Sequence, residues 1–159
     1  SLGAKTVTGE KLKYTTSDKK VVTVSTAGKI TVKGIGKATI TITSPESASY
    51  KAATPVKVTI TITPKSVKLS TVKSIKTKAI KVTWKKDTSV TGYEILYSQK
   101  SNFKGAKKVT VTKNKTVSAT IKKLTKNKTY YVKVRAYKTV KGKKIYGAYS
   151  SVKKVKVTK

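Results

Sequence analysis

The sequence contains no cysteine, no histidine and no methionine among its 159 residues. Without cysteine and histidine the chain has no thiol nucleophile, no imidazole base and no ligands for a Cys/His zinc site. Acidic residues are also scarce, because 5 Asp and Glu stand against 38 Lys and Arg, which gives a net charge of +33. These absences predict a protein that is not an enzyme and that binds neither a metal nor a cofactor.

Long hydrophobic runs are missing as well. No apolar stretch approaches the roughly 20 residues that a membrane-spanning helix needs, so we expect no membrane insertion. The start of the chain, Ser1-Leu2-Gly3, lacks the basic and then apolar layout of a signal peptide. We therefore expect a monomeric fragment of a larger chain. The lack of cysteine does not fix the compartment, since both cytosolic proteins and many surface proteins do without disulfides.

What the sequence does contain is a regular alternation of apolar residues with threonine or lysine. The alternating runs lie at 22–24, 29–33, 38–43, 56–62, 80–84, 93–97, 108–111, 130–137 and 155–157. This period of two is typical of half-buried strands, and no stripe with a helical period persists anywhere. Turn-forming glycines and asparagines separate the runs. The sequence therefore predicts an all-β fold built as an antiparallel sandwich.

A domain boundary is predicted at Thr63-Pro64-Lys65-Ser66, where a strand ends and proline removes a backbone donor. Charge density changes at the same place. Residues 1–64 hold ten lysines and three acids, net +7, whereas residues 65–159 hold 27 lysines, one arginine and two acids, net +26. We predict two domains, at 1–64 and at 65–159, of which the first is small enough to be only marginally stable alone.

The second predicted domain carries a strand pattern with tryptophan and tyrosine at characteristic positions. The residues are Ile80, Val82 and Trp84, then Gly92, Tyr93, Ile95 and Tyr97, and finally Leu124, Tyr130, Val132, Val134 and Ala136. Over nearly all of 65–159 this pattern resembles a fibronectin type III domain. The Pro-Gly that the family usually has between Leu124 and Tyr130 is replaced by Thr125-Lys126-Asn127-Lys128, which implies a different turn.

The first predicted domain is similar to a bacterial Ig-like domain of group 2. The similarity rests on residues 12–18, 21–24, 28–32 and 34–42. Tyr14 stands where tryptophan is common, and the first strand of the family is shortened or missing. Both families are modules of secreted and cell-surface proteins, and tandem arrays of them resemble the stalks and adhesive regions of Gram-positive surface proteins. The resemblance implies two tandem Ig-like β-sandwiches, bacterial Ig-like and then fibronectin type III, at the cell surface, in the cell wall or secreted.

Strand parity predicts a basic and aromatic face on the outside of the second domain. If Tyr130, Val132 and Val134 point inward, the alternate residues of that strand and of its neighbour point outward. These outward residues are Glu94, Leu96, Tyr131, Lys133, Arg135 and Tyr137. Such a face could stack on sugars or bases while its cations hold sulfate, phosphate or carboxylate groups. The alternative is that tyrosine and lysine are simply good outward strand residues, with Glu94 and Arg135 paired across strands.

Two lysine clusters are further candidates for contact with polyanions. One lies in a predicted hairpin and consists of Lys138, Lys141, Lys143 and Lys144; the other lies in a loop and consists of Lys122, Lys123, Lys126 and Lys128. The alternative is a solvated edge, because lysine also prevents strands from pairing with other chains. Teichoic acids, sialylated or sulfated mucin glycans and extracellular DNA are compatible partners. Their binding would be salt-dependent and largely non-specific.

Three functions are consistent with these features. The first is a non-catalytic structural or adhesive module of a bacterial surface or secreted protein, acting as a spacer and contacting anionic cell-wall or host glycans. The second is a dedicated polyanion or nucleic-acid binder, which the +26 charge of the second domain suggests. The third is an accessory region of a secreted glycan-degrading enzyme. Nothing in the sequence separates the three.

Overall fold

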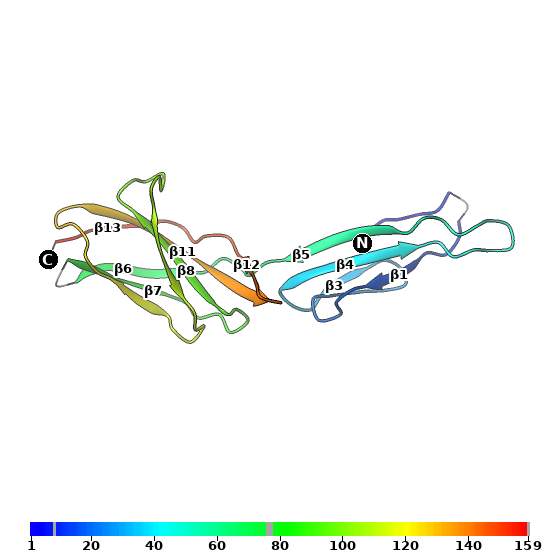
Figure 1. The fold of residues 1–159 in the computed structure, drawn as a ribbon, viewed down its shortest axis with the longest axis horizontal. Coiled ribbons are helices and arrows are strands. Elements are labelled where there is room, and N and C mark those ends of the chain that lie inside the picture. The colour runs from blue at the N-terminus through cyan, green and yellow to red at the C-terminus, as the bar shows by residue number, and fades with distance from the viewer. Residues whose placement is uncertain (8, 76–77, 159) are drawn as a thin grey trace. The chain divides into compact units, whose positions relative to one another are not determined.

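The computed structural model of the chain describes residues 1–7, 9–75 and 78–158, and these residues form strands, turns and loops with no helix among them (Figure 1). Their contacts divide the chain into two compact units, the N-terminal unit Ser1–Ile62 and the C-terminal unit Thr63–Lys159. The sequence predicted the domain boundary after Pro64, and the contacts in the structure place it after Ile62. The all-β prediction is confirmed.

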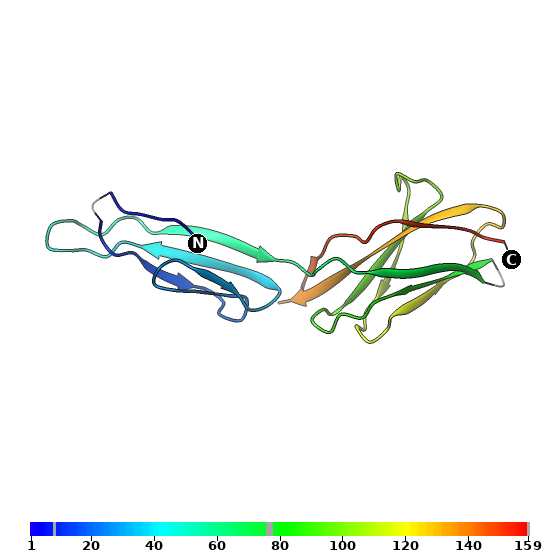
Figure 2. The ribbon, with the colours of Figure 1, turned by 180° about the vertical axis from the view of Figure 1, so that it is seen from behind.

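The N-terminal unit is built from one three-stranded antiparallel sheet and one hairpin (Figure 2). The sheet has the order β1 (Lys13–Thr16), β4 (Gly36–Thr43) and β5 (Val56–Ile62), and the hairpin consists of β2 (Val22–Val24) and β3 (Ile30–Val32). Its core contains five buried aliphatic side chains, Val21, Val22, Ala38, Ile40 and Ile42. Alternate residues of β4 supply three of them, because successive side chains of a strand point to opposite faces.

The β2–β3 hairpin turns at Gly28, whose φ of 72° lies in the left-handed region that glycine adopts without strain. A Cβ at this position would also lie 3.0 Å from the ring of Tyr14. Tyr14, in the place where the family commonly has tryptophan, thus covers the turn, and only glycine lets it approach so closely.

The C-terminal unit is a two-layer sandwich. One sheet has the order β10 (Ser118–Ile121), β7 (Ala79–Trp84) and β6 (Leu69–Ile75). The other has the order β12 (Lys143–Tyr146), β11 (Thr129–Val140), β8 (Gly92–Ser98) and β9 (Lys107–Val111), and β13 (Lys153–Lys156) pairs with the first part of β11. All of the pairings are antiparallel.

The core of this unit is aliphatic and aromatic, as the alternation predicts. Trp84 and Tyr93 are buried, and their ring centroids lie 5.3 Å apart in a tilted pair. Alternate residues of β11 from Tyr130 to Ala136 are buried against them. Tyr97, predicted to point inward, is half-buried, and its ring centroid lies 6.4 Å from that of Tyr130.

Strand β12 lies in the predicted hairpin, but three strands, namely β1, β6 and β10, were not predicted. Their sequences do not alternate cleanly between apolar and polar residues. In β6, for example, serine and threonine follow Leu69 in succession and a bulge shifts the register between Leu69 and Thr71. Tertiary pairing with a stronger neighbour, β4 for β1 and β7 for β6 and β10, determines these strands.

The turn from Thr125 to Lys128 closes despite the missing Pro-Gly. The Lys128 N–H donates to the Thr125 carbonyl at 3.4 Å, and Asn127 has a φ of 63°. Asparagine tolerates this left-handed conformation better than most residues, so it takes over the position that a turn of type II usually gives to glycine.

In the N-terminal unit the first residues lie partway along β5 (Figure 2), where the Leu2 N–H donates to the Gly28 carbonyl, and the last residue, Ile62, pairs with Gly36 at the start of β4. The six steps from residue 36 to residue 42 span roughly 20 Å at about 3.3 Å per residue.

In the C-terminal unit the chain enters near one end of β11 and leaves near the other. Pro64 packs against Gly147, whose N–H donates to the Ala136 carbonyl. At the opposite end of β11 the Val157 N–H donates to the Lys128 carbonyl, and the Thr158 N–H donates to Ser74 Oγ. The chain thus crosses this unit over a distance on the order of 25 Å.

Candidate functional site

The predicted basic and aromatic face lies on the outer side of the β8–β11 sheet. The register sets Glu94 of β8 opposite Arg135 of β11, Leu96 opposite Lys133, and Gly92 opposite Tyr137. The structure therefore brings together the residues that strand parity placed on one face. It also adds Phe103, Tyr146 and Tyr149, which come from outside the two strands.

Arg135 and Glu94 form an ion pair at the centre of this face. Arg135 Nη2 lies 2.6 Å and Nε lies 2.9 Å from Glu94 Oε1, and the Tyr149 hydroxyl donates to the same oxygen at 3.1 Å. The Glu94 side chain is 5% exposed and that of Arg135 is 25% exposed. Among the described residues this is the one salt bridge. The pairing of Glu94 with Arg135 across strands, considered above as the alternative to binding, is confirmed.

The environment of Glu94 favours its charged form. Burial raises the pKa of this carboxyl, but the hydrogen bonds from Arg135 and Tyr149 and the positive charges of Arg135 and Lys108 outweigh burial and hold the pKa below the ordinary value of 4.5. The carboxylate is therefore ionised at neutral pH and already has its hydrogen-bond partners within the chain.

The cations of the outer face are covered by the chain's own aromatic rings. The Arg135 guanidinium lies 3.9 Å from the ring centroid of Tyr146 and 4.5 Å from that of Tyr149. Lys133 Nζ lies 4.1 Å from the centroid of Phe103 and 4.5 Å from that of Tyr149. These are cation–π distances, and they leave the two cations engaged within the protein.

Tyr137 is on the predicted outer face, yet it is 2% exposed. Tyr146 covers it, with ring centroids 5.8 Å apart, and Lys144 Nζ lies 4.5 Å from its ring. Gly92 makes room below, since a Cβ there would lie 2.8 Å from the Tyr137 hydroxyl. Tyr137 therefore has no face on which a sugar or base could stack, whereas Tyr131 is half-buried.

The lysines of the hairpin between β11 and β12 are distributed along its two paired strands and its turn. Lys141 and Gly142 form its two-residue turn, with φ values of 48° and 75° that match a primed hairpin turn. Lys138 is half-buried and pairs with Ile145, while Lys141, Lys143 and Lys144 are exposed.

The second predicted lysine cluster is divided by the structure. Lys122 and Lys123 line a pocket together with lysines of the β8–β9 connection, whereas Lys126 and Lys128 are exposed and do not line it. Sequence analysis missed the contribution of residues 99–107, because nothing in the sequence shows that two connections so far apart lie at the same end of the sandwich.

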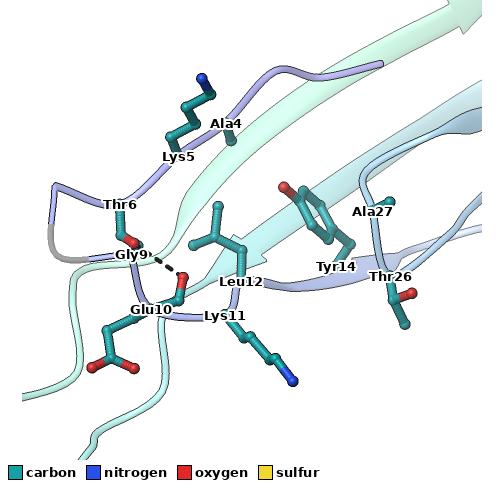
Figure 3. A pocket seen from close by; sticks show the side chains of 10 residues that line it. All are labelled: Ala4, Lys5, Thr6, Gly9, Glu10, Lys11, Leu12, Tyr14, Thr26 and Ala27. Atoms are coloured by element: carbon teal, nitrogen blue, oxygen red, sulfur yellow. Dashed lines mark hydrogen bonds between the residues drawn. The ribbon is translucent and has the colours of Figure 1, made fainter.

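The N-terminal unit has an open pocket of about 740 Å³ beneath its first residues. Figure 3 shows Lys5, Glu10 and Lys11 directed away from one another, with Leu12 between Lys5 and Lys11 and Tyr14 beyond Leu12 toward Ala27. The Thr6 hydroxyl donates to the Glu10 carbonyl, so this hydrogen bond joins two residues of the pocket lining to each other. Without convergent polar groups this pocket does not have the features of a ligand site.

The described residues include no cluster of three or more His, Cys, Asp or Glu side chains that could hold a metal ion. In the same part of the chain there is no helix with the length and hydrophobicity needed to cross a membrane.

Family models match both units in the predicted order. The model of the bacterial Ig-like domain (group 2) matches residues 2–56, and that of the fibronectin type III domain matches residues 63–150. The chain belongs to the fibronectin type III family, and a bacterial Ig-like domain of group 2 precedes its fibronectin type III domain. Both families consist of non-catalytic structural domains.

Solved structures support the same fold. A two-domain fibronectin type III segment of chicken tenascin aligns with a TM-score of 0.57 at 16% identity, covering 92% of this chain and 82% of that one. The FN1–FN3 domains of chicken CNTN1 align with a TM-score of 0.53, also at 16% identity. That alignment covers 95% of this chain but only 58% of the CNTN1 chain. No curated protein matches the sequence.

These findings define the class of protein. The chain is a tandem of β-sandwich modules of the kind that serve structure or adhesion, and such modules are typical of extracellular or cell-surface proteins.

Proposed function

We propose that the chain is a spacer and adhesive module of a bacterial cell-surface or secreted protein. The observation that carries this proposal is the path of the chain through the C-terminal unit, which it enters near one end of β11 and leaves near the other. A module of this kind adds length to a stalk, because whatever precedes it and whatever follows it attach at opposite ends. The family assignments are consistent with this role.

The pairing of the strands suits a chain under load. Near the exit of the C-terminal unit, β13 pairs with β11 over four residues, and near its entrance β6 pairs with β7. Tension between the two ends acts along these strands, so several backbone hydrogen bonds have to break together before the unit opens.

A surface-display experiment tests the spacer function. The chain is placed between a cell-wall anchor and a terminal epitope on a Gram-positive bacterium, and antibody access to the epitope is measured. We expect access to increase over that of the same anchor and epitope joined by a flexible linker of ten residues. Equal access with and without the chain would refute the spacer function.

The lysines supply a second, weaker component of the proposed function. A net charge of +26 on the C-terminal unit attracts anionic polymers such as wall teichoic acids, acidic host glycans or extracellular DNA. Retention on heparin and DNA columns at increasing salt measures this attraction. Release from both columns below physiological ionic strength would limit the charge to a role in solubility.

A further inference from the structure

One pocket of the C-terminal unit concentrates lysines that the outer face does not use. It has a volume of about 520 Å³ and lies between the β8–β9 connection and the β10–β11 connection. Five lysines line it, Lys100, Lys104, Lys107, Lys122 and Lys123, and its lining contains no acidic residue. Two segments that are separate in the sequence thus converge on a single positively charged concavity.

The acids of this unit lie elsewhere. Asp87 is in the connection before β8, whereas the pocket is at the other end of β8, and Asp87 Oδ1 accepts hydrogen bonds from Ser89. Glu94 is held on the outer face by Arg135. Because positive potential is focused in a concavity with low-dielectric walls, the five lysines attract anions more strongly there than on a convex surface.

The pocket is rigid on its β8–β9 side. Ser98 Oγ accepts from the Lys100 N–H and donates to the Lys104 carbonyl, and Asn102 Oδ1 accepts from the Lys104 N–H. The Phe103 N–H donates to the Lys100 carbonyl and so closes the loop. These bonds fix the backbone from which Lys100 and Lys104 extend, which lowers the entropy lost on binding.

The floor of the pocket is also held in place. The Tyr130 hydroxyl accepts hydrogen bonds from the Thr125 N–H at 3.1 Å and from Gln99 Nε2 at 2.9 Å. Burial raises the pKa of Tyr130, but these donors and the charge of Lys107 outweigh it and lower the pKa. Tyr130 therefore tethers the start of the β10–β11 connection to the sheet and experiences the positive charge of the pocket.

The side chains of the lining determine which ligand fits. Tyr130 is 6% exposed, and the half-buried Tyr97 has its ring centroid 6.4 Å from that of Tyr130, so the pocket presents no fully exposed aromatic ring on which a nucleobase could stack. Lysine ammonium groups are compact point charges that suit sulfate and phosphate oxygens. Gln99 and Thr125 are exposed and add polar atoms of the kind that contact the hydroxyls of a sugar or polyol.

We propose that this lysine pocket is a binding site for sulfate or phosphate esters carried by an extracellular glycan or polyol chain. The site is distinct from the outer face and from the hairpin cluster, and it relies on the proposed function only for the extracellular origin of the ligand.

Two variants of the full chain with the same net charge test the proposal. The pocket variant carries Lys104→Gln, Lys107→Gln and Lys122→Gln, and the control variant carries Lys141→Gln, Lys143→Gln and Lys153→Gln. All six lysines are exposed, so both variants should fold, which circular dichroism and thermal melting verify. Each variant loses three positive charges, so any effect of total charge is the same in both.

Calorimetric titration at physiological salt measures binding of three probes. The first is a heparin octasaccharide, the second is a glycerol-phosphate oligomer of similar charge, and the third is an oligothymidylate of similar charge. We expect at least one of the two ester probes to bind the unchanged chain, with affinity about tenfold weaker for the pocket variant and less than about twofold weaker for the control. Comparison of the heparin and glycerol-phosphate titrations decides whether sulfate or phosphate is the natural group.

Three results would overturn the proposal. They are equal losses in the two variants, no binding of either ester probe to the unchanged chain, and tighter binding of the oligothymidylate than of both esters. Equal losses would leave general attraction by the positive charge intact, and the surface-display experiment does not depend on these lysines. Failure of the pocket and failure of the spacer function are therefore distinguishable.

Discussion

The two units are both β-sandwich modules, but they are stabilised differently. The N-terminal unit depends on a small aliphatic core centred on Ile40, whereas the C-terminal unit has an aromatic core around Trp84 and a second layer on its outer face. In that second layer Arg135 and Tyr149, both partly exposed, cover and hydrogen-bond the buried carboxylate of Glu94. The comparison shows that a strongly basic unit can retain one carboxylate by covering it outside the main core.

The different stabilisation of the two units matters because they carry different net charges. The C-terminal unit carries a net charge of +26 with only two acids, and the N-terminal unit carries +7 with three. Mutual repulsion of the lysines destabilises the compact state of the C-terminal unit more. One of its two acids is nevertheless placed where it interacts with Arg135 at 2.6 Å.

The largest effect is expected from equivalent core truncations in the two units. Ile40→Ala and Ile95→Ala each remove a fully buried side chain and should each cost about 2–5 kcal/mol. A unit of this small size has a total stability of roughly 3–9 kcal/mol, so Ile40→Ala should unfold a large fraction of the N-terminal unit. Ile95→Ala should lower the melting temperature of the C-terminal unit and leave it folded.

Amide NMR spectra of the full chain report on the two units separately. Dispersed signals from residues 1–62 should be lost in Ile40→Ala, and those of residues 63–158 should persist in both variants. Loss of the C-terminal signals in Ile95→Ala, with the N-terminal unit unaffected by Ile40→Ala, would show that the N-terminal unit is the more stable of the two.

The next largest effect concerns the covered carboxylate. Glu94→Gln leaves Arg135 without its ionic partner and should destabilise the C-terminal unit by about 2–3 kcal/mol. Tyr149→Phe removes one donor to Glu94 and should cost about 1 kcal/mol. Urea unfolding followed by tryptophan fluorescence measures both, since Trp84 is the one tryptophan of the chain.

Glu46→Gln is the control for the loss of one negative charge from the chain, because Glu46 is exposed in the connection between β4 and β5 of the N-terminal unit. It should change stability by less than about 0.5 kcal/mol. If Glu94→Gln had as small an effect as Glu46→Gln, the outer network would contribute nothing to folding.

The pH dependence of the C-terminal unit follows from Glu94. Its pKa in the folded unit is lowered from 4.5, so its stabilising contribution is fully present above the unfolded pKa and is lost as pH falls through the lower, folded pKa. Thermal melting of the C-terminal unit should therefore shift to lower temperature below pH 4.5. The shift should be smaller in Glu94→Gln, and an identical acid dependence in both proteins would assign it to other groups.

The smallest predicted effect separates the two units by their charge. Raising sodium chloride from about 0.02 M to about 0.5 M shortens the Debye length and screens the repulsion among exposed lysines. The C-terminal unit should gain stability, by less than about 1 kcal/mol, and the N-terminal unit should gain less. Calorimetric melting at the two salt concentrations resolves the units; a larger gain for the N-terminal unit would mean that net charge does not govern the response.

Much of the fold was predictable because a strand has a period of two. Alternation identified β4, β5, β7, β8 and β11 and assigned their inward residues, including Trp84, Tyr93 and Val134. It failed for β6 and β10, whose short or polar sequences become strands only by pairing with β7.

The candidate site was less predictable than the fold. Parity placed Glu94, Arg135 and Tyr137 on the outer face, but an outward direction is not the same as exposure. Tyr146 and Tyr149 lie over these residues, and no periodic signal in the sequence places either of them there. The lysine pocket was missed for the same reason, since its two segments meet only through the order of the strands.

The sequence by itself determined the class of fold, the sign of the charge and the absence of thiol and imidazole chemistry, since these depend on composition and on local periodicity. Only the tertiary structure decided which outward side chains remain accessible and which lysines share a concavity. The physical reason is that a strand's alternation specifies the side of the sheet on which a residue lies, whereas the neighbours that cover it come from distant segments of the chain.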